Sequence, residues 1–210
     1  MTTPHLRHGR LPWLAPDAMT PEQRAVYEAI QGGPRSRAGG VLAVTDADGR
    51  LEGPFNLMLI NPAVGNALQS LGSAIRFSTA LTARQRELAI LEVAAFTRSD
   101  FEWYAHERLG RRAGLTEDEI AAVHNGVEAA GLDPGERAVR ELSRQILATG
   151  DLDDPSFQQG AAVLGVELVT ELVVLIGYYR LLALAMLVLR TPLPASAAPI
   201  EWPPRPAETS

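Results

Sequence analysis

Apolar residues recur along most of the chain with the spacing of amphipathic helices. Each periodic stretch begins near a side-chain oxygen that can cap free backbone N–H groups, and several carry proline at the first helical position. Glycine follows the end of several stretches, as is usual where helices terminate. These signals predict eight helices, near residues 21–31, 62–77, 83–97, 100–113, 117–125, 134–149, 155–164 and 167–189.

Three stretches fall outside this helical pattern. Residues 41–53, VLAVTDADGRLEG, favour an extended conformation, with a short hairpin around Asp48-Gly49. The proline-rich ends predict an irregular N-terminal arm (1–19) and an irregular C-terminal tail (191–210), whose Trp13 and Trp202 could strap onto a neighbouring surface. The pattern therefore predicts a single all-α domain over residues 20–190.

The last predicted helix is unusually apolar. VVLIGYYRLLALAMLVL, residues 173–189, is long enough to raise the question of a membrane span. Arg180 stands in its middle, and a charge at that position is costly in lipid. We therefore expect no membrane segment, but a buried helix that also forms a subunit interface in a homo-oligomer. The N-terminal stretch lacks the apolar core of a signal peptide, which favours a cytoplasmic protein.

Composition removes several classes of function. The formal charge of −6 gives no field that attracts nucleic acid or an anionic membrane. The 210 residues include no cysteine, which excludes disulfides, thiolate metal sites and thiol nucleophiles. They also include no lysine, which excludes Schiff-base catalysis and covalent attachment of pyridoxal phosphate.

Candidate chemistry lies in two consecutive helices. The helix predicted over 83–97 is apolar almost all round, yet it contains Glu87. In the next helix Glu102 and His106 stand one turn apart on a face that is otherwise apolar. Two or three residues separate the helices, so they should form a tight antiparallel hairpin that gathers Glu87, Glu102 and His106. A histidine between carboxylates has its cationic form favoured, which would make His106 a proton donor near neutral pH.

Structural explanations for the same residues remain open. Ser99-x-x-Glu102 matches a helix-capping box, Glu87 could pair with Arg84 or Arg98, and His106 could bond a backbone carbonyl. Glu87, Glu102 and His106 could also supply three metal ligands, and a metal-dependent lyase is a further alternative. The other histidines lie in the N-terminal arm or at a helix end, so we expect neither a metal site nor a cofactor.

The segment RELAILEVAAFTRSDFEWYAHERLGRRAGLTEDEIAAV, residues 86–123, resembles the carboxymuconolactone decarboxylase family, which shares its fold with alkyl hydroperoxidase D (AhpD). The motifs FEW-x-x-H and GLT-x-x-EI are the parts most specific to the family. A broader similarity extends over about residues 20–190. The resemblance implies an all-α subunit that assembles into trimers or hexamers, with sites in helical clefts near the subunit interfaces.

The resemblance also implies roles for particular residues. In the peroxidase branch of the family a glutamate, a CxxC pair and a histidine form a proton relay. Glu87 and His106 stand at the glutamate and histidine positions, whereas Ser99 and Glu102 occupy the cysteine positions. A thiol peroxidase is therefore excluded, while the acid–base half of the relay is retained.

In the decarboxylase branch, the resemblance implies cofactor-free loss of CO₂ from a small carboxylated lactone or a related enolisable acid. We assign His106 as the general acid, Glu102 as its orienting partner and Glu87 as a second proton carrier. Arg98 is the candidate clamp for the substrate carboxylate, and Ser99 and Trp103 complete the expected substrate-binding set. An isomerase, dehydratase or aldol-type enzyme and a non-catalytic oligomer that binds a small acid remain alternatives.

Overall fold

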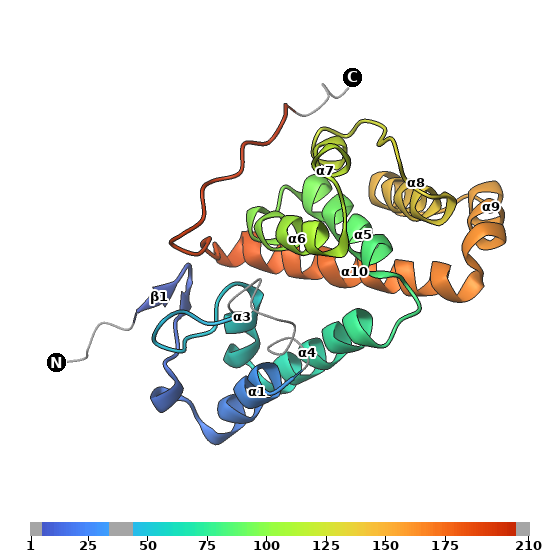
Figure 1. The fold of residues 1–210 in the computed structure, drawn as a ribbon. Helices are drawn as coiled ribbons and strands as arrows, with labels where there is room; N and C mark the ends of the chain where they lie inside the picture. Colours follow the sequence, from blue (N-terminus) through green and yellow to red (C-terminus); the bar gives the residue numbers. More distant parts are fainter. Residues whose placement is uncertain (1–5, 34–43, 205–210) are drawn as a thin grey trace.

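The computed structural model of the chain describes residues 6–33 and 44–204, which fold into a helical assembly (Figure 1). Every helix that periodicity predicts is present, with ends within one residue of the expected ones. The helices are α1 (Pro21–Gln31), α3 (Pro54–Ile60), α4 (Pro62–Phe77), α5 (Ala83–Thr97), α6 (Asp100–Ala113), α7 (Glu117–His124), α8 (Pro134–Thr149), α9 (Asp154–Leu164) and α10 (Val166–Leu189). The all-α prediction is confirmed.

Local capping explains why these boundaries could be predicted. The side chain at the N-terminus of α1, α5, α7 and α8 bonds the third helical N–H, and the third side chain bonds back. Such reciprocal boxes use only residues within one turn, so the sequence alone specifies them. Helix α3 was missed because it has seven residues, begins after Gly53 and has no side-chain cap.

Helix α5 lies at the centre of the fold, between α6, α8 and α10 (Figure 1). One of its sides packs through Ala89, Ile90 and Val93 into a large apolar cluster with α8 and α10. Its other side packs through Leu88, Leu91 and Ala94 against Trp103, α7 and the C-terminal tail. Because α5 is buried on both sides, its few polar side chains must find partners inside the protein.

The N-terminal arm is more ordered than the sequence predicts. Strands β1 (Arg7–His8) and β2 (Leu11–Pro12) form an antiparallel pair, and a short 3₁₀ helix (Pro16–Ala18) follows. The buried ring of His8 accepts a hydrogen bond at Nε2 from the Gly53 backbone N–H (3.1 Å), and Trp13 donates to the Leu51 carbonyl (2.9 Å). The arm therefore holds the segment that precedes α3.

That segment was predicted as a hairpin over residues 41–53. Within the part that the structure describes, residues 44–53 form a tight turn closed by a single antiparallel bridge between Thr45 and Leu51. Residues 41–43 lie outside the described residues. The turn is stabilised by Arg50, which pairs with Asp46 (3.0 Å) and Asp48 (2.5 Å).

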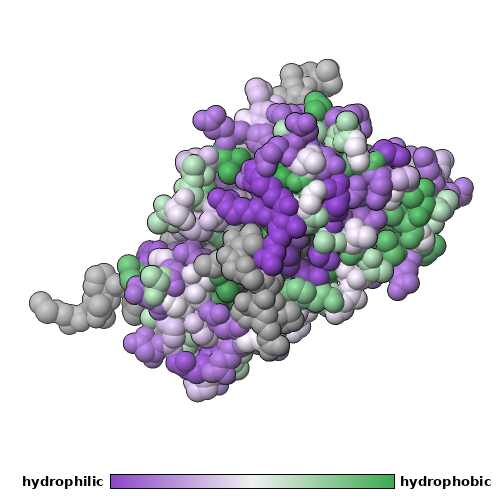
Figure 2. Space-filling model, in the orientation of Figure 1, coloured by the Kyte–Doolittle hydropathy of each residue, from purple (hydrophilic) through white to green (hydrophobic). Residues whose placement is uncertain are grey.

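Helix α10 is less buried than expected. Among the described residues it is the one helix whose length and composition would allow it to cross a membrane, a test that core helices of soluble proteins also pass. It buries residues such as Leu172 and Leu175, but leaves Leu184 and Leu187 each 62% exposed in the single chain. Figure 2 shows another apolar area on an otherwise largely polar face, where α9 meets the start of α10.

Candidate active site

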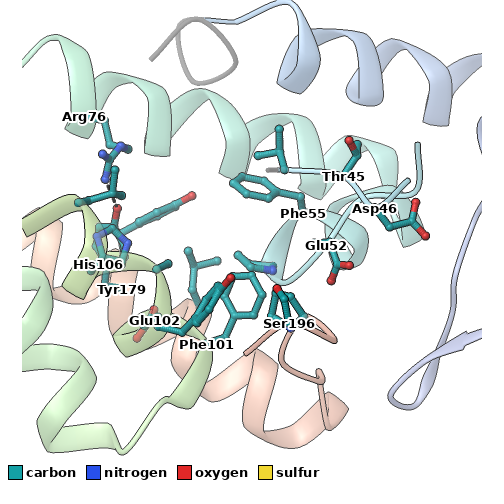
Figure 3. Close-up of a pocket in the computed structure, with 18 of the residues that line it drawn as sticks. Thr45, Asp46, Glu52, Phe55, Arg76, Phe101, Glu102, His106, Tyr179 and Ser196 are labelled. Atoms are coloured by element: carbon teal, nitrogen blue, oxygen red, sulfur yellow. Dashed lines mark hydrogen bonds between the residues drawn. The ribbon is translucent and has the colours of Figure 1, made fainter. Parts of the chain in front are cut away.

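A cavity of about 410 Å³ opens among the turn before α3, helices α3, α4, α6 and α10, and the first residues of the C-terminal tail (Figure 3). Its walls are largely aromatic, with Phe55, Phe77, Phe101, Tyr104, Tyr178 and Tyr179. The polar side chains on the wall are Thr45, Asp46, Glu52, Arg76, Glu102, His106 and Ser196. The volume suits a small organic molecule.

The α5–α6 hairpin brings Glu87 and His106 together, as the sequence predicts. His106 Nδ1 lies 2.6 Å from Glu87 Oε2, and both side chains are buried. The left-handed backbone of Arg98 (φ 51°) ends α5 and lets α6 run back beside it. His106 also lines the cavity, so the pair joins the protein interior to the space where a ligand would bind.

Two arginines surround Glu87 and set its charge. Arg76 Nη2 lies 3.3 Å and Arg86 Nε 3.9 Å from Glu87 Oε1. Burial alone would raise the pKa of Glu87, but His106, Arg76 and Arg86 together outweigh it and lower the pKa. Glu87 is therefore an ionised carboxylate at neutral pH.

His106 favours the neutral form of its imidazole, whereas the sequence predicted the cationic form. Burial lowers the pKa of its imidazole, and the attraction of Glu87 offsets that only in part. The neutral ring must carry its proton on Nδ1, because the Glu87 carboxylate can only accept. Nε2 then holds a free lone pair, so the resting His106 is a proton acceptor and not the cationic donor predicted from the sequence.

Arg76 and Tyr179 are site residues that sequence reasoning missed. Arg76 Nη1 donates to the Tyr179 hydroxyl (3.4 Å), and the Tyr179 ring packs edge-on against His106, with centroids 5.1 Å apart. Arg76 lies in the last turn of α4, where an arginine is ordinary, and Tyr179 lies within an apolar run. The signal that could have found them was the Tyr178-Tyr179 pair inside that run, with two polar hydroxyls to satisfy.

Glu102 lies on the cavity wall without a partner. It is 3% exposed, and neither carboxyl oxygen has a hydrogen-bond partner among the described residues. Burial raises the pKa of Glu102 well above its usual value, and the nearby Ser99 hydroxyl offsets this only in part. Burial therefore favours the protonated form of Glu102, which suits a proton donor.

Two expectations for Glu102 are corrected by this geometry. The residue that orients His106 is Glu87, because the Nδ1 contact goes to Glu87 and not to Glu102. The capping box is also absent, since Ser99 stands at the N-terminus of α6 without a side-chain cap bond.

The three expected substrate-binding residues lie outside the cavity. Arg98 donates to the Pro203 carbonyl (2.5 Å), so its guanidinium group binds the C-terminal tail. Trp103 is buried against the rings of His124 (4.9 Å) and Trp202 (5.5 Å), and Ser99 lines a separate surface hollow. The positive charge on the described cavity wall comes from Arg76 instead.

The structure also bears on the other roles considered for these residues, which were an ion pair of Glu87 with Arg84, a bond of His106 to the backbone and a metal site. Arg84 pairs with Glu119 (2.8 Å) and Glu136 (2.5 Å) and not with Glu87. His106 bonds a carboxylate and not a backbone carbonyl. Within residues 6–33 and 44–204, no group of three or more His, Asp or Glu side chains is arranged to hold a metal ion.

Known proteins share this fold at low sequence identity. The AhpD core of an uncharacterised peroxidase-related protein from Ralstonia eutropha JMP134 superposes with a TM-score of 0.71 at 15% identity, over 90% of this chain and 94% of that chain. A cysteine-to-alanine variant of the debrominase Bmp8, in complex with 2,3,4-tribromopyrrole, superposes with a TM-score of 0.67 at 14% identity, over 91% of this chain and 94% of that chain. These similarities establish the fold alone.

Two sequence comparisons complete the assignment. A search of curated proteins finds no match for the chain. Residues 62–145, which include α4 to α7 and most of α8, match the model of the carboxymuconolactone decarboxylase family. Glu87, Glu102 and His106 all lie within the matched segment. Residues 62–145 are therefore similar to the carboxymuconolactone decarboxylase family, and the described chain has the AhpD-like fold.

Proposed function

We propose that the chain is an acid–base enzyme that forms the enolate of a small molecule without a cofactor, with decarboxylation as the leading reaction. The observation that carries this proposal is the His106–Glu87 pair on the wall of an aromatic cavity, 2.6 Å apart and beside the neutral acid Glu102. A neutral base, an anion that supports it and a separate acid are the groups that enolate chemistry requires.

The first step uses His106 as a base. Nε2 accepts a proton from a carbon next to a carbonyl group, and the imidazolium that forms is stabilised by the Glu87 carboxylate at Nδ1. The electron pair of the broken C–H bond moves onto the carbonyl oxygen. The imidazolium then returns its proton, so His106 acts as a donor only after it has acted as a base.

Two other groups on the wall suit the developing oxyanion. Arg76 supplies a fixed positive charge, and Glu102 supplies an O–H donor from a carboxyl group whose own hydrogen-bonding capacity is unused. Groups that are already oriented toward a developing charge stabilise the transition state without reorganising.

Decarboxylation reaches the same enolate by a different bond cleavage. The bond to the carboxylate carbon breaks, CO₂ leaves, and the electron pair moves onto the conjugated carbonyl oxygen. The carbon must then take up one proton, which Glu102 holds at neutral pH and regains from solvent. In this reaction Glu102, rather than His106, is the proton donor.

The test is proton exchange, which needs no knowledge of the natural substrate. Acetophenone has an enolisable methyl group and fits the cavity by size. In D₂O, the wild-type protein should accelerate deuterium incorporation into that methyl group, as followed by NMR, and His106→Asn should reduce the rate by ~10²–10⁴-fold. Exchange no faster than in buffer, or equally fast with the variant, would contradict the proposed function. Release of CO₂ from a panel of carboxylated lactones would then distinguish decarboxylation from simple enolisation.

We also propose that the functional form is a cytoplasmic homo-oligomer, a trimer or a hexamer. The support is the row of exposed apolar residues on α10, among them Leu181, Leu184 and Val188, because such a face is usually covered by another subunit. Light scattering at micromolar concentration should give several times the 22.6 kDa of one chain. A monomer in that measurement would contradict the assembly and leave the catalytic proposal standing.

A further inference from the structure

We propose that Glu52 forms a second polar subsite, at the end of the cavity away from His106, which binds a hydrogen-bond donor of the substrate such as a hydroxyl or amino group. This inference rests on the proposed function, because it names the substrate class of the same cavity. The substrate would be a flat molecule with an enolisable group at one end and a donor group at the other.

The first observation is that the described part of the chain offers the Glu52 carboxyl group no partner. It is 9% exposed and lines the cavity. No hydrogen bond or ion pair of its carboxyl group is found among the described residues. Burial raises the pKa of Glu52, and the charge of Asp46 raises it further. A carboxyl group that lines a cavity without a partner in the described chain is free to accept a hydrogen bond from a ligand.

The second observation is the position of Glu52. Figure 3 shows Thr45, Asp46, Glu52 and Ser196 at one side of the cavity, and Arg76, His106 and Tyr179 at the other. The charge of Asp46 is compensated by Arg50, which lies 3.0 Å from it. Among the described residues, Glu52 is therefore the acid left uncompensated at its end of the cavity, whereas Arg76 and Arg86 lie beside the Glu87 carboxylate at the His106 end.

The third observation is that the backbone around Glu52 is fixed. Gly53 has φ +56°, and a Cβ there would lie 2.1 Å from the Phe101 ring, so only glycine fits this approach. Its N–H is held by His8, and the carbonyl of Leu51 by Trp13. Both neighbours of Glu52 are thus anchored by the N-terminal arm, and Glu52 is held in place before any ligand arrives, which favours binding.

The charges on the wall then decide which ligands fit. A hydroxyl or amino group can donate to Glu52, while a carboxylate placed there would meet a like charge in an apolar cavity. A site with a buried acceptor also discriminates against an analogue that lacks the donor. The subsite should therefore select for a donor and against an anion at the end of the ligand far from His106.

Four para-substituted ketones test this selection. Acetophenone, 4-hydroxyacetophenone, 4-aminoacetophenone and 4-acetylbenzoate share the same enolisable end and differ at the other. Dissociation constants are measured by NMR titration at neutral pH for wild type, Glu52→Gln and the control Asp48→Asn. Asp48 is an exposed acid on the same turn. Wild type should bind the hydroxy and amino ketones about tenfold or more tightly than 4-acetylbenzoate.

The variants separate the subsite from the catalytic proposal. Glu52→Gln should remove the discrimination against 4-acetylbenzoate, because the glutamine keeps the shape, loses the charge and can donate to a carboxylate. Asp48→Asn should keep the wild-type order. His106→Asn should keep that order while losing deuterium exchange. If exchange is absent and the order is kept, the catalytic proposal fails and the subsite stands. Equal affinities in wild type, an unchanged order in Glu52→Gln, or no binding of any ketone would overturn the subsite.

Discussion

Helix α5 carries two buried glutamates, Glu87 and Glu92, five positions apart, which are used in different ways. Glu92 Oε1 lies 2.5 Å from Arg140 Nε, deep in the protein. Arg140 also donates to the carbonyls of Ala122 (3.2 Å) and Val127 (2.5 Å), so this pair ties α5 and α8 to the end of α7. Glu87 instead pairs with a neutral imidazole that lines the cavity.

The difference shows how a structural pair can be distinguished from a candidate catalytic pair. Burial raises the pKa of Glu92 despite the opposing effect of Arg140, and neither residue of the pair lines the cavity. The pKa of Glu87 is lowered despite its burial, because His106 and two arginines surround it. A titratable partner at a cavity wall, such as His106, can gain or lose a proton during a reaction, whereas an arginine partner stays charged. Four variants sharpen or break this comparison.

The largest effect is expected for Glu87→Gln. The amide keeps the size of the side chain but cannot stabilise an imidazolium, and it can bond the wrong tautomer of His106. Exchange of the acetophenone methyl protons should fall by ~10²–10⁴-fold. The matched change Glu92→Gln, on the same helix, should leave the exchange rate of the folded protein within about threefold of wild type. Equal losses in the two variants would remove the distinction between the pairs.

The second effect concerns stability, where Glu92→Gln should lose more than Glu87→Gln. Glu92→Gln leaves the Arg140 guanidinium buried without its counter-charge, and breaking a buried pair in this way costs about 3–5 kcal/mol. Glu87→Gln leaves a neutral histidine and two arginines, Arg76 and Arg86, whose side chains are 16% and 15% exposed against 4% for Arg140. The cost should therefore be smaller, about 1–3 kcal/mol. Urea denaturation measures both. A larger loss for Glu87→Gln would indicate that its contacts with Arg76 and Arg86 serve the fold first.

The third effect is smaller and appears only as a dependence on pH. The raised pKa of Glu102 means that the folded protein holds this proton, while the unfolded chain releases it above about pH 4.5. The free energy of unfolding of wild type should therefore fall as pH rises above 4.5, until the folded group also ionises. Glu102→Gln lacks this loss, so its free energy of unfolding should rise relative to that of wild type from pH 4 to pH 8. A constant difference across that range would show that Glu102 is already ionised.

The last effect concerns His106, whose pKa is lowered by burial. Below about pH 6.5 the unfolded chain takes up a proton that the folded imidazole does not, so this residue removes stability as pH falls toward the folded pKa. In His106→Asn that part of the acid destabilisation should disappear, which thermal melting at pH 5 and pH 7 would measure. A variant that loses more stability at pH 5 than wild type would indicate a cationic His106, as the sequence predicted.

How much was predictable depended on the range of the interactions. The helices and the approach of Glu87 to His106 follow from caps and one tight hairpin, which residues close in sequence specify. Arg76, Tyr179 and Glu52 reach the cavity through the packing of α4, α10 and the turn before α3, which no local pattern encodes. Arg98 was misplaced because a left-handed residue reverses the direction that helical spacing implies.

Ser99 and Glu102 show a different limit. Their spacing matches a capping box as well as that of Thr82 and Gln85, which does form one. At Glu102 the side chain lies instead on the cavity wall, where its carboxyl group stays unsatisfied in the folded chain. A local rule that fails at one such position is often a mark of a functional site.

The C-terminal tail has a practical consequence for anyone who trims this protein for crystallisation. Pro194, Ala195 and Ser196 form part of the cavity wall, and Trp202 fixes the tail by stacking on His124 and donating to Asp100 (2.7 Å). A chain shortened after Leu189 would keep every helix and still lose one side of its binding site. Such a protein could melt cooperatively and crystallise well, yet report a weak affinity that belongs to the truncation and not to the natural molecule.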